Sequence, residues 1–211
     1  MSVAPFTIKV EDLSKRFNRE WIFRHLHYQF RSGETYAITG PNGSGKSTLL
    51  QVLWGQLPPT SGTIRYEKTG SEIPVDHLFR HISIATPYMH LIDEFTLEEM
   101  LRFHFKLKKL RSGLNIEDLP RLMYLEEARE KQLVNFSSGM KQRLKLAVAF
   151  YTESDVYFLD EPGTNLDRRA FAWYRDELGK IPAQSITFIA SNNPEEYPKN
   201  AQNLAIMNMK P

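Results

Sequence analysis

A nine-residue segment, Gly40-Pro-Asn-Gly-Ser-Gly-Lys-Ser-Thr48, combines three glycines with a lysine and hydroxyl side chains. The spacing matches G-x-x-x-x-G-K-[ST], in which glycines let backbone N–H groups turn toward a phosphate. Lys46 supplies a positive charge for the β- and γ-phosphates, and the Ser47 hydroxyl suits Mg²⁺. The segment therefore predicts a site for a nucleoside triphosphate, formed by Gly40, Pro41, Asn42, Gly43, Ser44, Gly45, Lys46, Ser47 and Thr48.

Two adjacent carboxylates, Asp160 and Glu161, follow the apolar run Val-Tyr-Phe-Leu. Consecutive strand residues point to opposite sides, so the two acids have different roles. We expect Asp160 to hold Mg²⁺ through water and Glu161 to orient or deprotonate an attacking water. An isolated Asp-Glu pair is more often a solvated strand end. The nearby phosphate loop favours the catalytic interpretation.

The elements that must position these residues alternate between strand and helix patterns. Strands are predicted at 6–13, 26–30, 35–39, 62–66, 82–85, 156–159, 185–190 and 204–207. Helices are predicted at 46–54, 96–105, 116–125, 141–151 and 169–178. The loop at 40–45 lies between a strand and a helix, which argues against a glycine-rich turn that matches by chance. The alternation predicts an α/β fold with a mainly parallel sheet.

A further segment, Asn135-Phe-Ser-Ser-Gly-Met-Lys-Gln-Arg143, resembles the signature of the ATP-binding cassette (ABC) family, Leu-Ser-Gly-Gly-Gln followed by a basic residue and Gln-Arg. Ser137 and Gly139 match the signature, whereas Ser138 and Met140 depart from it. Small residues at a helix N-terminus can form an anion site. An ordinary N-capped amphipathic helix is the alternative explanation.

Other stretches also resemble this family. Glu161-Pro-Gly-Thr-Asn-Leu-Asp167 is similar to its D-loop, with Asp167 at the aspartate. Leu13-Ser-Lys-Arg-Phe17 resembles the segment whose aromatic ring stacks on adenine, unless Phe17 is an ordinary core residue. Two expected residues are replaced: Pro87 stands where the family has a glutamine, and Asn192 where it has its switch histidine. Asparagine can hydrogen-bond a γ-phosphate but carries no positive charge.

The resemblance implies a P-loop NTPase core at 1–86 and 137–211, with an N-terminal antiparallel β subdomain and an inserted helical subdomain at about 87–136. It also implies that two such domains, as a homodimer or a heterodimer, pair head to tail around ATP and Mg²⁺. Ser137, Ser138, Gly139 and Met140 would then contact the nucleotide of the other copy. Hydrolysis would let the pair open. We expect a slow ATPase, because Pro87 and Asn192 replace two family residues.

Composition limits the alternatives. The 27 basic and 25 acidic residues give a net charge of +2, so direct nucleic-acid binding is not expected. The N-terminus lacks a secretory pattern, and no stretch approaches the ~20 apolar residues of a spanning helix. With these limits, the resemblance to the ABC family implies a cytoplasmic subunit, held on the inner face of the membrane by an integral membrane transporter subunit. The apolar segment at 88–92 would either contact that partner or pack internally.

Two other functions remain open from the sequence. One is a soluble ABC protein of translation or DNA maintenance, although such proteins usually carry two cassettes or a coiled-coil insertion. The other is a nucleotide-gated switch with little hydrolysis, which the replacements at Pro87 and Asn192 would allow. A P-loop kinase of small metabolites is disfavoured by the segments at 137–143 and 160–167. The transported substrate and its direction depend on the membrane subunit.

Overall fold

The computed structural model describes residues 5–209 of the 211-residue chain. The chain divides into two compact units. The first contains the chain up to residue 82, residues 154–161 and the C-terminal part from residue 182, and the second contains residues 83–153 and 162–181. The second unit thus includes more chain than the helical subdomain expected at 87–136, which stays a prediction. The absence of a secretory pattern was inferred partly from residues 1–4, which lie outside the described residues.

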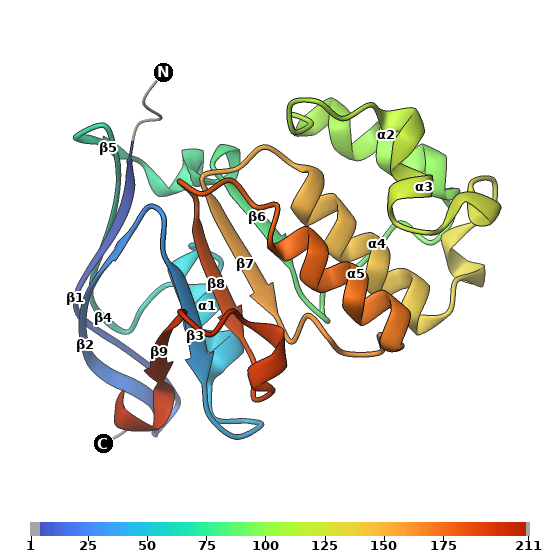
Figure 1. Ribbon diagram of the computed structural model, residues 1–211. Helices are drawn as coiled ribbons and strands as arrows, with labels where there is room; N and C mark the ends of the chain where they lie inside the picture. Colours follow the sequence, from blue (N-terminus) through green and yellow to red (C-terminus); the bar gives the residue numbers. More distant parts are fainter. Residues whose placement is uncertain (1–4, 210–211) are drawn as a thin grey trace. The chain divides into compact units, whose positions relative to one another are not determined.

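The helices and strands follow one another in the order that the sequence predicts, with one further strand, β5, at Ser71–Ile73 (Figure 1). The strands are β1 (Phe6–Phe17), β2 (Glu20–Arg31), β3 (Thr35–Thr39), β4 (Ser61–Lys68), β5 (Ser71–Ile73), β6 (Ile82–Ala85), β7 (Val156–Asp160), β8 (Ile186–Ala190) and β9 (Gln202–Ala205). The α-helices are α1 (Lys46–Leu53), α2 (Leu97–Leu107), α3 (Leu119–Leu122), α4 (Ser138–Tyr151) and α5 (Arg168–Leu178).

The N-terminal strands form an antiparallel sheet with the order β2-β1-β4-β5. In β1, Phe6, Ile8 and Val10 are buried and alternate with half-buried residues, as expected for a strand with one face on the core. Both first strands are longer than predicted, since β1 continues through a register shift near Asp12 to Phe17, and β2 begins at Glu20. The antiparallel β subdomain is therefore confirmed.

The second sheet has the strand order β6-β7-β8-β3-β9. Strand β3 pairs in parallel with β8 and β9, and β7 pairs in parallel with β8. All five residues of β7 and of β8 are buried, which is typical of central strands covered on both faces. The carboxyl ends of β3, β7 and β8 carry the phosphate loop, the acidic pair and the segment of Asn192. The predicted α/β fold with a mainly parallel sheet is confirmed.

Aromatic side chains link the two sheets within the first unit. Phe30 of β2 meets Tyr36 of β3 and Phe188 of β8 edge to face, with ring centroids 4.9 and 4.8 Å apart. Phe188 in turn stacks on Phe158 of β7 at 4.9 Å. Such pairs contribute about 0.5–1.5 kcal/mol beyond their buried area. They fix the sheet whose ends carry the candidate site.

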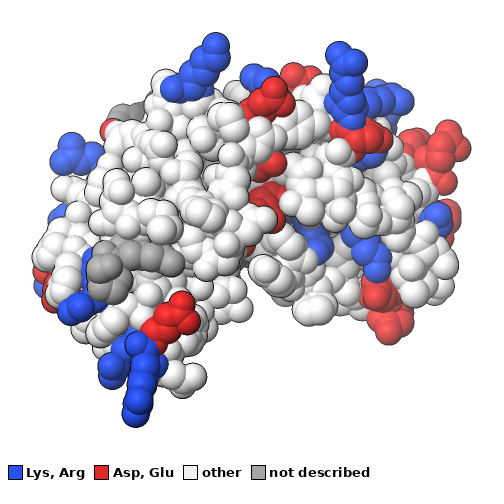
Figure 2. Space-filling model, turned by 90° about the horizontal axis from the view of Figure 1, so that it is seen from below, with Lys and Arg blue, Asp and Glu red and all other residues white. Residues whose placement is uncertain are grey.

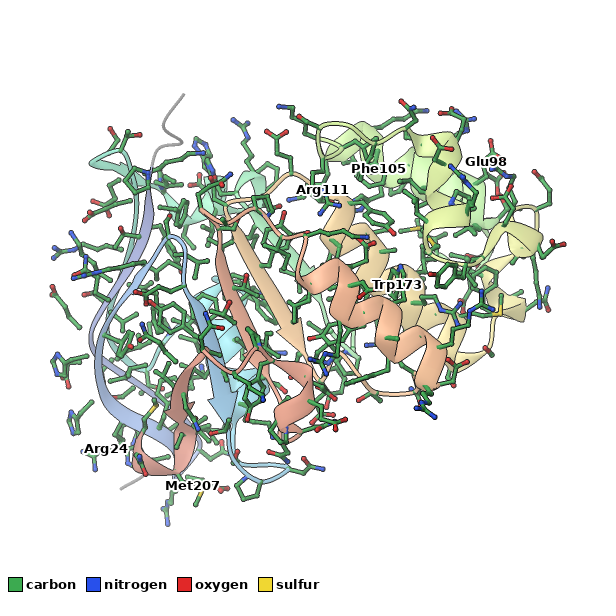
Figure 3. The ribbon with its side chains drawn as sticks, viewed as in Figure 1. Arg24, Glu98, Phe105, Arg111, Trp173 and Met207 are labelled. Atoms are coloured by element: carbon green, nitrogen blue, oxygen red, sulfur yellow. The ribbon has the colours of Figure 1, made fainter. Side chains whose placement is uncertain are left out.

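The second unit is built around helices α4 and α5 (Figure 3). Trp173 projects from α5 and donates a hydrogen bond from Nε1 to the Leu122 carbonyl at 2.9 Å. Arg111 lies 3.7 Å from the carboxylate of Glu177 on α5, and its backbone N–H donates to the Tyr151 carbonyl at 2.7 Å. These contacts tie the segments around α2 and α3 to the two longer helices.

Helix α2 begins at the predicted capping box. The Thr96 hydroxyl accepts from the Glu99 N–H at 3.2 Å, and the Glu99 carboxylate accepts from the Thr96 N–H at 2.8 Å. The helix expected over 116–125 is wrong in extent, because only Leu119–Leu122 is α-helical and a 3₁₀ turn precedes it. Pro120 cannot donate a backbone hydrogen bond, and Tyr124 has a φ of 55°, which stops the helix.

The strand expected at 204–207 is also displaced. Strand β9 ends at Ala205, and a 3₁₀ helix, Ile206–Met209, follows. The turn buries Ile206 fully beside the phosphate loop, where a Cβ on Gly40 would lie 2.7 Å from its Cγ2. Ile206 is therefore packed against the phosphate loop instead of extending strand β9.

Candidate functional site

The phosphate loop occupies residues 40–45, between the end of β3 and the start of α1. Gly45 has a φ of 107°, a region that side chains rarely adopt, and a Cβ there would collide with the Ile22 side chain of β2. The loop backbone at Gly45 thus packs closely against a side chain of the antiparallel sheet. No sequence motif points to Ile22 or Ile206 as supports of this loop, because each is an ordinary apolar residue of its own element.

Lys46 is the first residue of α1 and is only 4% exposed. Its Nζ donates to the carbonyl oxygens of Gly40 at 2.9 Å and Pro41 at 3.2 Å. The ammonium group therefore lies within the curve of the loop, close to where the helix N-terminus presents free N–H groups. Positive charge and helix dipole together favour an anion at this point.

Asp160 ends β7 with 1% of its surface exposed. Burial raises the pKa of its carboxyl group, while a hydrogen bond from the Ser47 hydroxyl opposes that shift. Its Oδ1 atom has no hydrogen-bond partner among the described residues, which is costly for a buried oxygen. A hydroxyl and an unpaired carboxylate oxygen are ligands that Mg²⁺ prefers, so Ser47 and Asp160 fit this metal.

Glu161 follows Asp160 in a left-handed conformation, with a φ of 44°. This conformation is strained for a residue with a side chain, and such strain is concentrated at functional sites. The Glu161 N–H donates to the carbonyl of Ala190 at the end of β8, at 2.9 Å. The sharp turn leaves Asp160 buried and Glu161 half-buried, so the two carboxylates lie in different surroundings.

Asn192 lies just beyond β8 and contacts the phosphate loop directly. Its side-chain nitrogen donates to the Asn42 side-chain oxygen at 2.7 Å. The structure thus brings Asn192 to the loop together with the acidic pair. An amide at this position can donate or accept a hydrogen bond, but it cannot take up a proton as histidine would.

Phe17 is the last residue of β1 and is 46% exposed. An aromatic ring buried in the core would show almost no exposed surface, so the interpretation of Phe17 as an ordinary core residue is wrong. The ring belongs to the same compact unit as the phosphate loop. It is available for stacking on a planar ligand.

The signature segment begins helix α4 in the second unit. Ser137 is its N-cap, and its hydroxyl accepts from the Met140 N–H at 3.3 Å. Ser138 is the first helical residue. A Cβ on Gly139 would lie 2.8 Å from the Asn165 carbonyl oxygen, so the small residue is required by the close approach of the D-loop backbone. Four predicted residues thus lie in the first turn of one helix.

Asp167 is the N-cap of α5. Its carboxylate accepts from the Ala170 N–H at 2.7 Å, which stabilises the helix start. The side chain of Gln142 on α4 donates to the Pro162 carbonyl at 3.0 Å and is buried. The D-loop and the signature helix α4 therefore meet at two points, Gly139 against Asn165 and Gln142 against Pro162. No sequence motif indicates the second of these contacts.

The segment around Pro87 forms part of a cavity in the second unit, with a volume of about 160 Å³. The Pro87 carbonyl accepts a hydrogen bond from Lys145 Nζ at 2.7 Å, while Lys141 pairs with Asp93 at 2.7 Å. Burial lowers the pKa of Lys145, and the charge of Lys141 lowers it further. Tyr88, which follows Pro87 in the sequence, is 70% exposed.

Charges on the face drawn in Figure 2 are of both signs, with lysine and arginine side chains interspersed among aspartate and glutamate. Within residues 5–209, every helix is too short or too polar to cross a bilayer.

Comparison with known proteins places these features in a family. The model of the ABC transporter family matches residues 23–164. An uncharacterized ABC transporter ATP-binding protein, YybJ of Bacillus subtilis, is 30% identical over 190 residues, which are 90% of this chain and 86% of that protein. The Nod factor export ATP-binding protein I of Burkholderia lata is 30% identical over 198 residues, covering 92% of this chain and 64% of that protein.

A solved structure has the same fold. A putative ABC transporter ATP-binding protein from Pyrococcus furiosus superposes with a TM-score of 0.79 over 97% of this chain and all of its own, at 20% identity. The family match covers more than half of the chain and contains the phosphate loop, the signature and the acidic pair. The chain is therefore a member of the ABC transporter family, in the class of its ATP-binding subunits.

Proposed function

We propose that this chain hydrolyses ATP and energises a membrane transporter by ATP-driven dimerisation. The observation that carries the proposal is the buried carboxylate of Asp160. The Ser47 hydroxyl donates a hydrogen bond to this carboxylate, but its Oδ1 atom has no hydrogen-bond partner among the described residues. The same compact unit holds Lys46 within the phosphate loop and Glu161 in a strained turn. A core that needed only to fold would not bury an unpaired carboxylate oxygen next to these groups.

In this mechanism, the loop N–H groups and Lys46 bind and orient the phosphates. Ser47 and Asp160 would hold Mg²⁺, which supplies neutralisation of charge on the phosphate oxygens when bound. Glu161 accepts the proton of the attacking water, or orients that water for in-line attack. Asn192 hydrogen-bonds the γ-phosphate, and Phe17 stacks on the adenine.

Dimerisation would complete the site. The N-terminus of α4, with Ser137, Ser138, Gly139 and Met140, is a second anion site that faces the γ-phosphate held by another copy or by a related ABC domain. Ser137 and Ser138 are exposed, which leaves them accessible to such a partner. Asp167 and the D-loop would line the same interface. ATP then joins the two domains, and hydrolysis removes the phosphate contact that holds them together.

The membrane partner would dock on the second unit. Tyr88 and the cavity beside Pro87 offer an exposed, partly apolar surface at the position where the family receives its membrane subunit. The names of the relatives, which include an ABC transporter ATP-binding protein and a Nod factor export ATP-binding protein, support a transport role. The chain would then work at the cytoplasmic face, and the membrane subunit would select the cargo.

Two measurements test the proposal. The Glu161→Gln variant with Mg-ATP should double its mass in light scattering, whereas Lys46→Ala should stay monomeric under the same conditions. Affinity purification from membranes should recover a multispanning protein. A Glu161→Gln chain that stays monomeric both in solution and beside that protein would contradict ATP-driven pairing, and recovery of ribosomes or nucleic acid would favour the soluble alternative.

A nucleotide-gated switch with little hydrolysis is the second candidate. It is favoured by the amide of Asn192, which bonds Asn42 at 2.7 Å and cannot relay a proton. A slow ATPase and a switch differ in one result: only the ATPase loses turnover when Glu161 is replaced by glutamine.

A further inference from the structure

Lys15 of β1 is buried although it carries a charge. Only 8% of its surface is exposed, and its Nζ donates to the Pro58 carbonyl at 2.7 Å. The same Nζ lies over the ring of Phe17, 5.0 Å from the ring centroid. A lysine ordinarily keeps its ammonium group in water and buries only its aliphatic stem. Here the residue is buried as a whole, and its ammonium group contacts a carbonyl and an aromatic face.

The segment that carries Phe17 is anchored at two further points. The Thr60 N–H donates to the Ser14 carbonyl at 2.8 Å, and the Arg16 N–H donates to the Thr60 hydroxyl at 3.0 Å. Residues 58–60 follow α1, the helix that begins at the phosphate loop. Lys15 connects residues 58–60 to the Phe17 ring, because its Nζ contacts both Pro58 and the ring. On the β1 side, the other two hydrogen bonds involve only backbone atoms.

The Phe17 ring therefore has two different surroundings. The Lys15 ammonium group lies over the ring, while 46% of the residue is open to solvent. A cation is attracted to the negative face of an aromatic ring, so Lys15 favours one ring orientation over the others. A ring that is already oriented loses less conformational freedom when a planar ligand stacks on it.

We propose that Lys15 is a positioning residue for the nucleotide base: its ammonium group holds the Phe17 ring in the orientation that stacks on a purine. This inference rests on the proposed stacking of Phe17 on adenine and extends it to a residue that does not touch the nucleotide. Lys15 would contribute to binding of the base and not to binding of the phosphates. That difference separates positioning from a purely structural role, which would affect both.

The test measures binding of two probes, Mg-ATP and Mg-tripolyphosphate, by calorimetry. Lys15→Met keeps the apolar stem length and removes the charge, and Lys15→Gln removes the charge but keeps a donor for Pro58. Both should weaken Mg-ATP binding by about two- to five-fold, the lower end of the range of cation–π contacts because the Phe17 ring is half open to solvent, and leave Mg-tripolyphosphate binding unchanged. Lys15→Arg, which keeps a cation over the ring, should bind Mg-ATP like the unmodified chain. Use of two charge-removing variants keeps the test valid if one of them fails to fold.

A double-mutant cycle completes the test. Phe17→Ala should weaken Mg-ATP but not Mg-tripolyphosphate, and Lys15→Met should have no further effect in that background. Equal weakening of both probes by the Lys15 variants, or no weakening of Mg-ATP, would overturn the inference while the proposed function stands. If Phe17→Ala left Mg-ATP binding unchanged, both the stacking role of Phe17 and the inference would be refuted. If no variant and not even the unmodified chain bound either probe, the proposed function itself would be wrong.

Discussion

Replacement of Gly139 by alanine tests the link between the signature helix and the D-loop. The added Cβ would lie 2.8 Å from the Asn165 carbonyl oxygen, whereas ordinary contact begins at 3.4 Å. The backbone must therefore separate by about 0.6 Å, the difference between these two distances. Asn165 resists this shift for two reasons. The contacted oxygen is a backbone atom and cannot rotate away as a side chain would, and the residue already has a φ of 62°.

The expected cost follows from two opposing effects. Overpacking of a tight contact costs about 1–3 kcal/mol. Alanine recovers about 0.4–1 kcal/mol relative to glycine in a helix, by reducing the freedom of the unfolded chain. The midpoints of these two ranges leave a net loss of about 1 kcal/mol. For a chain of this size such a loss lowers the melting temperature by about 2–4 °C.

Thermal unfolding without nucleotide, followed by circular dichroism, measures this effect. Gly179→Ala in α5's C-cap is the matched control, because the nearest atom to its added Cβ, the Asp176 carbonyl oxygen, is 3.5 Å away. Gly179 also has an ordinary φ of −67°, so the control should melt at or slightly above the temperature of the unmodified chain. A Gly139→Ala variant that is as stable as the control would refute the claim that the D-loop backbone requires glycine.

Three further changes test other parts of the account. Thr96→Ala removes the N-cap hydroxyl bonded to the Glu99 N–H and should lower the free energy of unfolding by about 0.5–2 kcal/mol in urea denaturation; an unchanged urea midpoint would argue against the capping box. Burial raises the pKa of Asp160, so between the ordinary carboxyl pKa and the raised one the folded state keeps a proton that the unfolded state has lost. The free energy of unfolding without nucleotide should therefore fall as pH rises through this interval. Asp160→Asn should remove that fall and be more stable than the unmodified chain at neutral pH; parallel pH profiles of the two would count against it. Asn192→His should raise ATP turnover if a missing proton carrier limits the rate, and a steady-state phosphate-release assay that finds no increase would assign the limit elsewhere.

Local sequence signals predicted the elements that depend on local chemistry. The apolar run at Thr35–Thr39 and the capping box at Thr96 appear in the structure as predicted, because a buried parallel strand and an N-cap both have short-range signatures. The strand Ser71–Ile73 was missed, since three residues with two exposed side chains give no alternating pattern. The helix at 116–125 was overestimated, because apolar spacing alone does not register the effect of Pro120.

The sequence points to the candidate site where motifs fix residue types, and gives no signal where distant segments meet. The loop, Asp160 and Glu161 follow from spacing and from position at strand ends. By contrast, two contacts join residues that are far apart in the sequence. Ile22 meets Gly45 across 23 positions, and Lys15 meets Pro58 across 43 positions. None of these residues stands in a pattern that predicts its contact. Such contacts depend on how the antiparallel sheet lies over the loop, which no local pattern specifies.

The central claim is that Glu161 makes this chain an ATPase. Steady-state release of phosphate from Mg-ATP by the unmodified chain should exceed that of Glu161→Gln by about 10²-fold or more, the contribution of a positioned general base. Mg-ATP binding by calorimetry should be the same for both. Equal turnover by the two proteins would contradict the account and leave a chain that binds the nucleotide without hydrolysing it.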